Sequence, residues 1–337
     1  MHTYSSTRQP VTPSTRTPST HQPNTYIPDY MKYAIIGTGA IGGYYGGLLA
    51  KAGHDVHFLL HSDYDHVCQH GLQVDSCGGS YHLCHINAYN STAQMPVCDV
   101  VIVAIKSIAN HLLPQMLAPI CHPDTLVLLI QNGIGLEADL CKAMPRAQLL
   151  GGVAYICTLK NAPGHITHTF NGLLQVGNYN CHNHEALSQM MADFAASGIK
   201  AKEMPYDEMR WKKAVWNMPF NGMTAAVGAV SAGSLIANAS MAPIIRQMML
   251  EVIGAAKACG VKGIDESYAD KMMDMTHRMP QFASSMKFDR DHHRPMELYY
   301  LYRRPLAEAR SRGADMPLIA MLAAELEYID AQSRQLS

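Results

Sequence analysis

Three polar side chains recur at four-residue intervals within one otherwise apolar stretch, namely Lys213, Asn217 and Asn221. Residues with this spacing lie on one face of an α-helix. Burying a lysine and two amides without partners is unfavourable, so this face is expected to border a polar cleft or a ligand.

A glycine-rich turn near the start of the chain indicates a dinucleotide-binding site. A short apolar strand at 32–36 runs into a Gly-x-Gly-x-x-Gly turn, a helix rich in small residues follows at 41–52, and another strand at 55–60. In this context the glycines allow a tight turn, close approach of a pyrophosphate and close packing of the helix, whose N-terminus attracts the anion. The residues expected to contact a dinucleotide are Gly37, Thr38, Gly39, Ala40, Ile41 and Gly42.

The end of the second strand bears on which dinucleotide is bound. NAD sites place an acidic residue there, where it binds the ribose 2′-hydroxyl. The strand ends here at Leu60 and His61, and Asp63 follows two residues later. The missing acid favours NADP, although no arginine replaces it and histidine is only partly charged near neutral pH. Alternatively, His61 is an ordinary surface residue.

Two further turns are expected at the carboxyl edge of the sheet. Lys106 follows an apolar strand at 100–105, and Asn132-Gly133-Ile134-Gly135 follows another at 126–130. Open α/β sheets bind ligands at this edge. Lys106 could therefore neutralise phosphate or substrate charge, and Asn132 could hydrogen-bond the nicotinamide ribose or the substrate. Taken singly, each residue is more simply interpreted as a loop lysine or a turn asparagine.

Two kinds of architecture must position these groups. Strand candidates alternate with helices over 31–205, which predicts an α/β Rossmann-type domain with a mostly parallel sheet. Over 206–337 apolar residues recur at helical spacing, which predicts an all-α substrate or catalytic domain. The other strand candidates are 72–75, 149–156 and 173–176, and further helices are expected at 109–118 and 135–143.

Composition narrows the functional class. The formal net charge of −1 on 337 residues argues against a nucleic-acid partner, and the longest apolar runs are far shorter than a bilayer-spanning helix. Nine scattered cysteines without a Cys-x-x-Cys pair predict reduced thiols and a cytoplasmic protein. The stretch 54–85 is rich in histidine and cysteine but lacks zinc-ligand spacing, so no metal is expected. Residues 1–30, rich in Ser, Thr and Pro, are expected to form a disordered extension.

The motifs together resemble the ketopantoate reductase (2-dehydropantoate 2-reductase) family from Met31 to about Asp330. The match includes the glycine turn, the lysine and asparagine turns, the Lys-x-x-x-Asn-x-x-x-Asn helix, and Ser285 with Glu297. The departures are His61, where the family often has an arginine, and the N-terminal tail. The resemblance implies NADPH-dependent reduction of 2-dehydropantoate to (R)-pantoate for pantothenate and coenzyme A synthesis. The active site would lie between the two domains.

The resemblance also implies roles for individual residues. Lys213 would be the acid and would contact the substrate, which Asn217 and Asn221 would orient and Ser285 would hold by its carboxylate. Glu297 would contact the cofactor or a substrate hydroxyl and would pair with Lys213 in the empty site. Lys106 and Asn132 would meet the cofactor, and Ser231 falls where many members place a substrate-binding asparagine or threonine.

Two other functions stay open at this stage. One is a related reductase acting on another 2-keto acid or a polyol, because a fold does not determine its substrate. The other is a non-catalytic dinucleotide-binding regulator, which the presence of both Lys213 and Glu297 disfavours. A small molecule is the expected partner, and a homodimer is left open.

Overall fold

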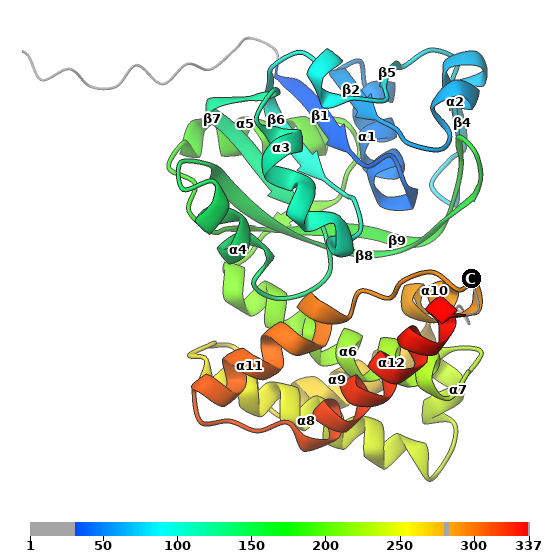
Figure 1. Cartoon of the computed structure of the whole chain (residues 1–337), viewed down its shortest axis with the longest axis vertical. Helices are drawn as coiled ribbons and strands as arrows, with labels where there is room; N and C mark the ends of the chain where they lie inside the picture. Colours follow the sequence, from blue (N-terminus) through cyan, green and yellow to red (C-terminus); the bar gives the residue numbers. More distant parts are fainter. Residues whose placement is uncertain (1–30, 280–282, 336–337) are drawn as a thin grey trace, which may run out of the picture.

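The structure is a computed structural model that describes residues 31–279 and 283–335. The extension expected over residues 1–30 lies outside the described residues. A sheet flanked by helices comes first along the chain, and a cluster of helices follows it (Figure 1). The predicted order of an α/β region and then an all-α region is confirmed.

The sheet has ten strands in the order β4-β3-β9-β8-β7-β6-β1-β2-β5, with β10 beside β9. Most neighbouring strands run parallel, as predicted, whereas β8 pairs with β9 and β3 with β4 in antiparallel fashion. The strands are β1 (Lys32–Ile36), β2 (Asp55–Leu59), β3 (Leu72–Ser76), β4 (Tyr81–Leu83), β5 (Asn87–Tyr89), β6 (Cys98–Val103), β7 (Cys121–Leu129), β8 (Gln148–Ala162), β9 (His165–Asn178) and β10 (Ala201–Glu203).

Side chains that alternate along the central strands pack into two separate hydrophobic cores, one on each face of the sheet. In β1, Tyr33 and Ile35 belong to the core that also contains side chains of α1 and α5, whereas Ala34 and Ile36 belong to the core under α3 and α4. Both faces of the sheet are therefore covered, as expected for nearly continuous apolar strands in a parallel sheet. The covering helices are α1 (Ala40–Lys51), α2 (Tyr64–His70), α3 (Leu113–Leu117), α4 (Leu136–Ala143) and α5 (His184–Ala196), with short 3₁₀ turns η1 (Thr92–Gln94) and η2 (Ser107–Leu112).

The helical region is organised around α6 (Tyr206–Ala226), which packs against α8, α10 and α12. Its core is a third cluster rich in methionine, which fills irregular gaps well. Within the described part of the chain, no helix has the length and apolar character needed to cross a bilayer. The other elements are α7 (Ala232–Ile236), α8 (Met241–Ala258), α9 (Ser267–Arg278), α10 (Ser285–Asp291), the π-helical η3 (Tyr299–Arg303), α11 (Arg304–Ser311) and α12 (Pro317–Gln335).

Helix α6 also joins the two regions, because its first turns rest on β8 and β9. A Cβ on Gly177 of β9 would lie 2.7 Å from the Cα of Tyr206, so glycine is what allows this close approach. In Figure 1 the long β8 and β9 strands face α6 across the junction. The polar face of α6 is thereby brought to the sheet.

Candidate active site

The Gly37–Gly42 turn joins β1 to α1, and steric contacts explain its glycines. Gly37 has φ +99°, and a Cβ there would lie 2.8 Å from the backbone nitrogen of Ile105. A Cβ on Gly42 would lie 2.2 Å from the carbonyl oxygen of Gly37, whereas one on Gly39 would meet nothing within 4 Å. The turn is tight, yet the space above Gly39 is open, as close approach of a pyrophosphate requires.

The remaining residues of the turn divide into two kinds. Helix α1 begins at Ala40 without a capping side chain, so the amides of Ala40 and Ile41 are available to an anion. Thr38 instead donates from its N–H and its hydroxyl to the carbonyl oxygen of Leu59, at 3.1 and 2.9 Å. Its side chain therefore fastens the turn to the end of β2. The backbone of this turn fits a dinucleotide diphosphate.

Replacing Gly42 by alanine is expected to lower affinity for the dinucleotide by a factor of about 5 to 100. The added Cβ must push α1 away from the turn, and overpacking of this kind costs about 1–3 kcal/mol. Calorimetric titration with NADPH would measure the loss. Gly254→Ala in α8 is the matched control, because a Cβ there meets nothing within 4 Å. Unchanged affinity in a folded Gly42→Ala protein would contradict a cofactor role for the turn.

Among the residues that follow β2 (60–63), no acidic side chain is exposed. His61 is exposed just beyond the strand. Asp63 is buried and accepts hydrogen bonds from the Lys160 ammonium at 3.0 Å and the Gly164 N–H at 3.1 Å. Asp63 therefore anchors the β8–β9 hairpin, and the exposed polar side chains just beyond β2 are those of His61 and Ser62.

Two contacts tie the loop after β6 to the helical region. The Lys106 ammonium lies 2.5 Å from a carboxylate oxygen of Asp289, and the Ser107 N–H donates to Glu297 at 2.6 Å. Burial raises the pKa of both carboxyl groups, and the ammonium of Lys106 opposes this at Asp289. The expected pairing of Glu297 with Lys213 is not found, because Ser107 holds that carboxylate instead.

The turn after β7 is docked on η3. The Ile134 N–H donates to the Tyr300 carbonyl at 2.9 Å. Gly133 has φ +120°, and a Cβ there would lie 2.6 Å from the Cβ of Tyr300. This docking carries Asn132 to α6, where its side-chain oxygen accepts a hydrogen bond from Asn217 at 3.1 Å.

The polar face of α6 contains the three residues singled out by their spacing. Asn217 and Asn221 are buried. The Lys213 ammonium makes no hydrogen bond or ion pair within the described ranges, and it lies 4.4 Å from the centre of the Tyr155 ring. Burial lowers the pKa of Lys213 to about 8, and the sulfur of Cys157 opposes this shift. An amine with such a pKa can donate a proton near neutral pH.

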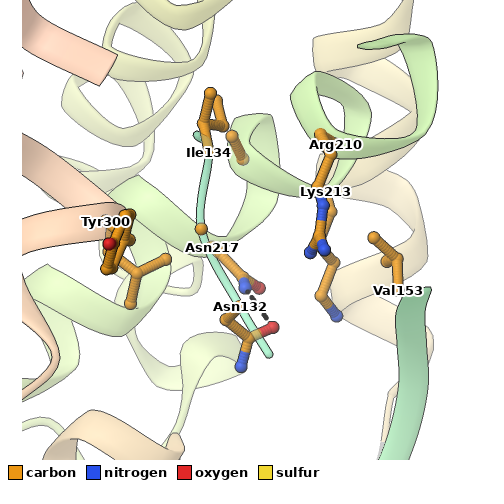
Figure 2. Close-up of a pocket in the computed structure, with 10 residues that line it drawn as sticks. Asn132, Ile134, Val153, Arg210, Lys213, Asn217 and Tyr300 are labelled. Carbon is orange, nitrogen blue, oxygen red and sulfur yellow. Dashed lines mark hydrogen bonds between the residues drawn. The ribbon is translucent and has the colours of Figure 1, made fainter. Parts of the chain in front are cut away.

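Lys213, Asn217 and Asn132 line a common pocket between the sheet and the helices (Figure 2). In Figure 2 the Lys213 side chain lies beside Arg210, and Asn217 points to Asn132. The cavity enclosed by these residues measures about 10 Å³, roughly the room needed by one water molecule, so side chains fill most of the pocket. The other lining residues are Gly133, Ile134, Val153, Arg210, Ala214, Tyr300 and Leu301.

A buried charge cluster that no short sequence motif predicts adjoins this pocket, and its Arg210 also lines the pocket. Arg210 donates to the carbonyl oxygens of Gln131 and Leu129, at 2.6 and 2.9 Å, and forms an ion pair with Glu137 of α4. The Tyr206 hydroxyl donates to the same carboxylate at 2.5 Å. Because Gln131 directly precedes Asn132, this cluster anchors α6 to the strand end that presents Asn132. Its members lie too far apart in sequence for spacing to reveal them.

Ser231 and Ser285, the two serines predicted to contact the substrate, lie in different environments. Ser231 is buried as the N-cap of α7, where its hydroxyl accepts from the Ser234 N–H at 3.1 Å, and it does not line the pocket around Lys213. Ser285 is exposed at the start of α10. The preceding Ser284, which was not selected from the sequence, caps α10 and hydrogen-bonds Thr224 of α6 at 2.6 Å. Ser231 and Ser284 thus have structural hydrogen bonds, and the exposed hydroxyl is that of Ser285.

The histidine-rich segment lies away from this pocket. His66, His70, His82 and His165 line a separate surface hollow. In the described ranges no group of three or more histidine, cysteine, aspartate or glutamate side chains is arranged to hold a metal ion.

Comparison with known proteins matches both regions. Residues 33–180 match the model described as ketopantoate reductase PanE/ApbA, and residues 206–329 match its C-terminal counterpart. The chain is 41% identical over 311 residues to a 2-dehydropantoate 2-reductase of Nostoc sp., covering 90% of this chain and 96% of the relative. A 2-dehydropantoate 2-reductase of Halobacterium salinarum is 25% identical, over 87% of this chain and 97% of its own.

Solved structures agree with this assignment. The crystal structure of 2-dehydropantoate 2-reductase from Geobacter metallireducens has a TM-score of 0.85 and 34% identity, covering 88% of this chain and 99% of its own. A D-mandelate dehydrogenase determined with NADH and anilino(oxo)acetate shares the fold, with a TM-score of 0.79 and 20% identity over 90% of this chain and 100% of its own. The two family models and the identity to the Nostoc enzyme show that this chain belongs to the ketopantoate reductase family.

Proposed function

We propose that this protein reduces 2-dehydropantoate to (R)-pantoate with NADPH. The observation that carries the proposal is the Lys213 ammonium, which makes no hydrogen bond or ion pair with any residue that the structure describes and lines a small pocket together with Asn132 and Asn217. The names of the Nostoc and Geobacter relatives support the choice of substrate. Residues 31–205 would hold the cofactor, and residues 206–337 would supply most of the groups that contact the substrate.

The cofactor would lie along the carboxyl edge of the sheet. The amides of Gly39, Ala40 and Ile41 would bind the diphosphate, since the space above Gly39 is open. Lys106 and Asn132 would contact the phosphates and the nicotinamide ribose, and Glu297 would bind a ribose or substrate hydroxyl. Bound NADPH supplies the hydride that reduces the C2 carbonyl.

Residues of the helical region would act on the substrate. The Lys213 ammonium would stabilise the developing negative charge on the carbonyl oxygen and then donate its proton there. Asn217 is already oriented by Asn132, and it would orient the substrate together with Asn221. The exposed hydroxyl of Ser285 would bind the carboxylate. Ser231 would act only indirectly, by fixing the start of α7.

The decisive experiment follows the nicotinamide absorbance band with 2-dehydropantoate, once with NADPH and once with NADH. The proposal predicts faster oxidation of NADPH, and a higher kcat/KM for 2-dehydropantoate than for 2-keto acids that lack its hydroxymethyl group. If another 2-keto acid were reduced with a higher kcat/KM, the substrate would be wrong. If no keto acid were reduced while NADPH still bound, the catalytic function would be wrong.

The exposed position of His61 leads to a prediction about cofactor choice. His61→Arg is expected to raise the preference for NADPH over NADH roughly tenfold, because a charged hydrogen bond to the 2′-phosphate adds about 1.5–3 kcal/mol. The ratio of kcat/KM with the two cofactors measures it. His66→Arg adds the same charge to an exposed position on α2 and serves as the control. An equal response in both variants would remove position 61 from 2′-phosphate recognition.

A further inference from the structure

The Lys213 ammonium rests on an aromatic ring contributed by the other region. Its Nζ lies 4.4 Å from the centre of the Tyr155 ring on β8 and 5.8 Å from that of Trp216 on its own helix. A cation over a ring face is attracted by the ring quadrupole, and the effect grows where water is excluded. Tyr155 is therefore an aromatic side chain of the sheet whose ring lies against the amine.

We propose that Tyr155 is a positioning residue for the proton donor Lys213, acting through the face of its ring. The inference rests on the proposed function, since it concerns the same lysine. The ring would hold the ammonium toward the pocket and would keep it protonated at neutral pH against the effect of burial. The phenol hydroxyl is not required for this role.

The other groups around Lys213 leave the ring as the main partner of its charge. On α6, Arg210 is paired with Glu137, and Lys212 with Glu208. From β8, burial raises the pKa of the Cys157 thiol to about 11, and from η3 it raises the pKa of Tyr300 to about 12, so both are neutral at pH 7. Asn132, from the turn after β7, is uncharged.

A second lysine–tyrosine pair beside the first provides a matched control. Lys212 lies 5.5 Å from the centre of the Tyr268 ring on α9, and the hydroxyl groups of Tyr155 and Tyr268 interact. Tyr268→Leu removes a ring of equal size next to Tyr155 but leaves the ring under Lys213. Tyr155→Phe removes the hydroxyl contact and keeps the ring. Tyr155→Leu removes the ring itself.

The test is the pH profile of kcat/KM for 2-dehydropantoate reduction in these three variants. Tyr155→Leu is expected to move the alkaline limb about one pH unit lower, so activity falls about fivefold at pH 8 and little at pH 6. Tyr155→Phe and Tyr268→Leu should keep the wild-type midpoint. An unmoved midpoint in Tyr155→Leu, or an equal shift in Tyr155→Phe, would overturn the inference.

Two further measurements distinguish loss of the ring contact from misfolding of a variant and from an error in the proposed function. Phenylalanines with one to three fluorine atoms at position 155 weaken the ring quadrupole with little change of shape, and the midpoint should fall stepwise with each fluorine. The pH dependence of Lys213 acylation by acetic anhydride, read by mass spectrometry, reports its pKa without substrate. A shift in acylation without any keto-acid reduction would support the ring contact and refute the proposed function. A pKa insensitive to fluorination would refute the ring contact.

Discussion

Lys213→Ala is expected to lower kcat for 2-dehydropantoate reduction by a factor of about 10²–10⁴ while NADPH affinity stays within about twofold. General acid catalysis contributes a factor of this size, and the ammonium would also stabilise the developing oxyanion. The amine lines the small pocket near Asn132 and Asn217, whereas the diphosphate is expected at the glycine turn. Steady-state kinetics with NADPH titration measures both quantities. A variant that keeps near-normal turnover would refute the assignment of Lys213 as the acid.

The Lys213→Arg variant tests proton donation by residue 213 separately from the effect of its positive charge. An arginine remains a cation but does not give up its proton in this pH range, so it could stabilise the oxyanion without acting as the acid. In the wild type the donor form of Lys213 is lost as pH rises through about 8, so kcat/KM should fall tenfold per unit above that value. Lys213→Arg should be slow and should lack this limb. An unchanged limb in Lys213→Arg would assign it to another group.

Glu137→Ala is expected to destabilise the protein by about 3–5 kcal/mol, because it leaves the buried Arg210 guanidinium without its carboxylate. Thermal unfolding should move down by roughly 10 °C, a shift that differential scanning fluorimetry can measure. The same change should lower kcat/KM in the surviving folded protein, since Arg210 also anchors the strand end that presents Asn132.

Two variants identify the cause of that loss. Glu327→Ala breaks the exposed pair with Arg303 and should cost less than about 1 kcal/mol. The double variant Glu137→Ala with Arg210→Met removes both buried charges and should recover part of the lost stability. The stability lost in the double variant is compared with the losses in Glu137→Ala and in Arg210→Met made singly. If the double variant lost as much as the two single variants together, lost packing rather than an unpaired charge would explain the effect.

The sheet and the order of the two regions could be predicted because long strands carry their own pattern. The seven strand candidates are all present, and the first, at 32–36, has the predicted bounds. The three-residue strands β4, β5 and β10 were missed, because so short a run has no measurable periodicity. The strands predicted at 149–156 and 173–176 were too short, since the outer parts of β8 and β9 are polar and depend on pairing with each other.

In the candidate site, too, the features that could be predicted are those whose residues lie close together in sequence. The shared face of Lys213, Asn217 and Asn221 follows from helical geometry alone, and the three glycines follow from local backbone constraints. The ion pair between Lys106 and Asp289 joins residues 183 positions apart. Ser107 and Glu297 are 190 apart, so no local pattern could show that Ser107 rather than Lys213 holds that carboxylate.

The amino-acid sequence by itself determined which chemical groups this protein can offer, because each motif is a property of a few neighbouring residues. The glycine turn and the lysine–asparagine face are of this kind, and they were sufficient to indicate the family. Only the tertiary structure decided the partners of those groups: Tyr155 beneath Lys213, Asn132 beside Asn217 and Glu137 against Arg210. Those contacts arise where α6 meets the sheet, and packing between distant segments controls both their geometry and the pKa of the amine.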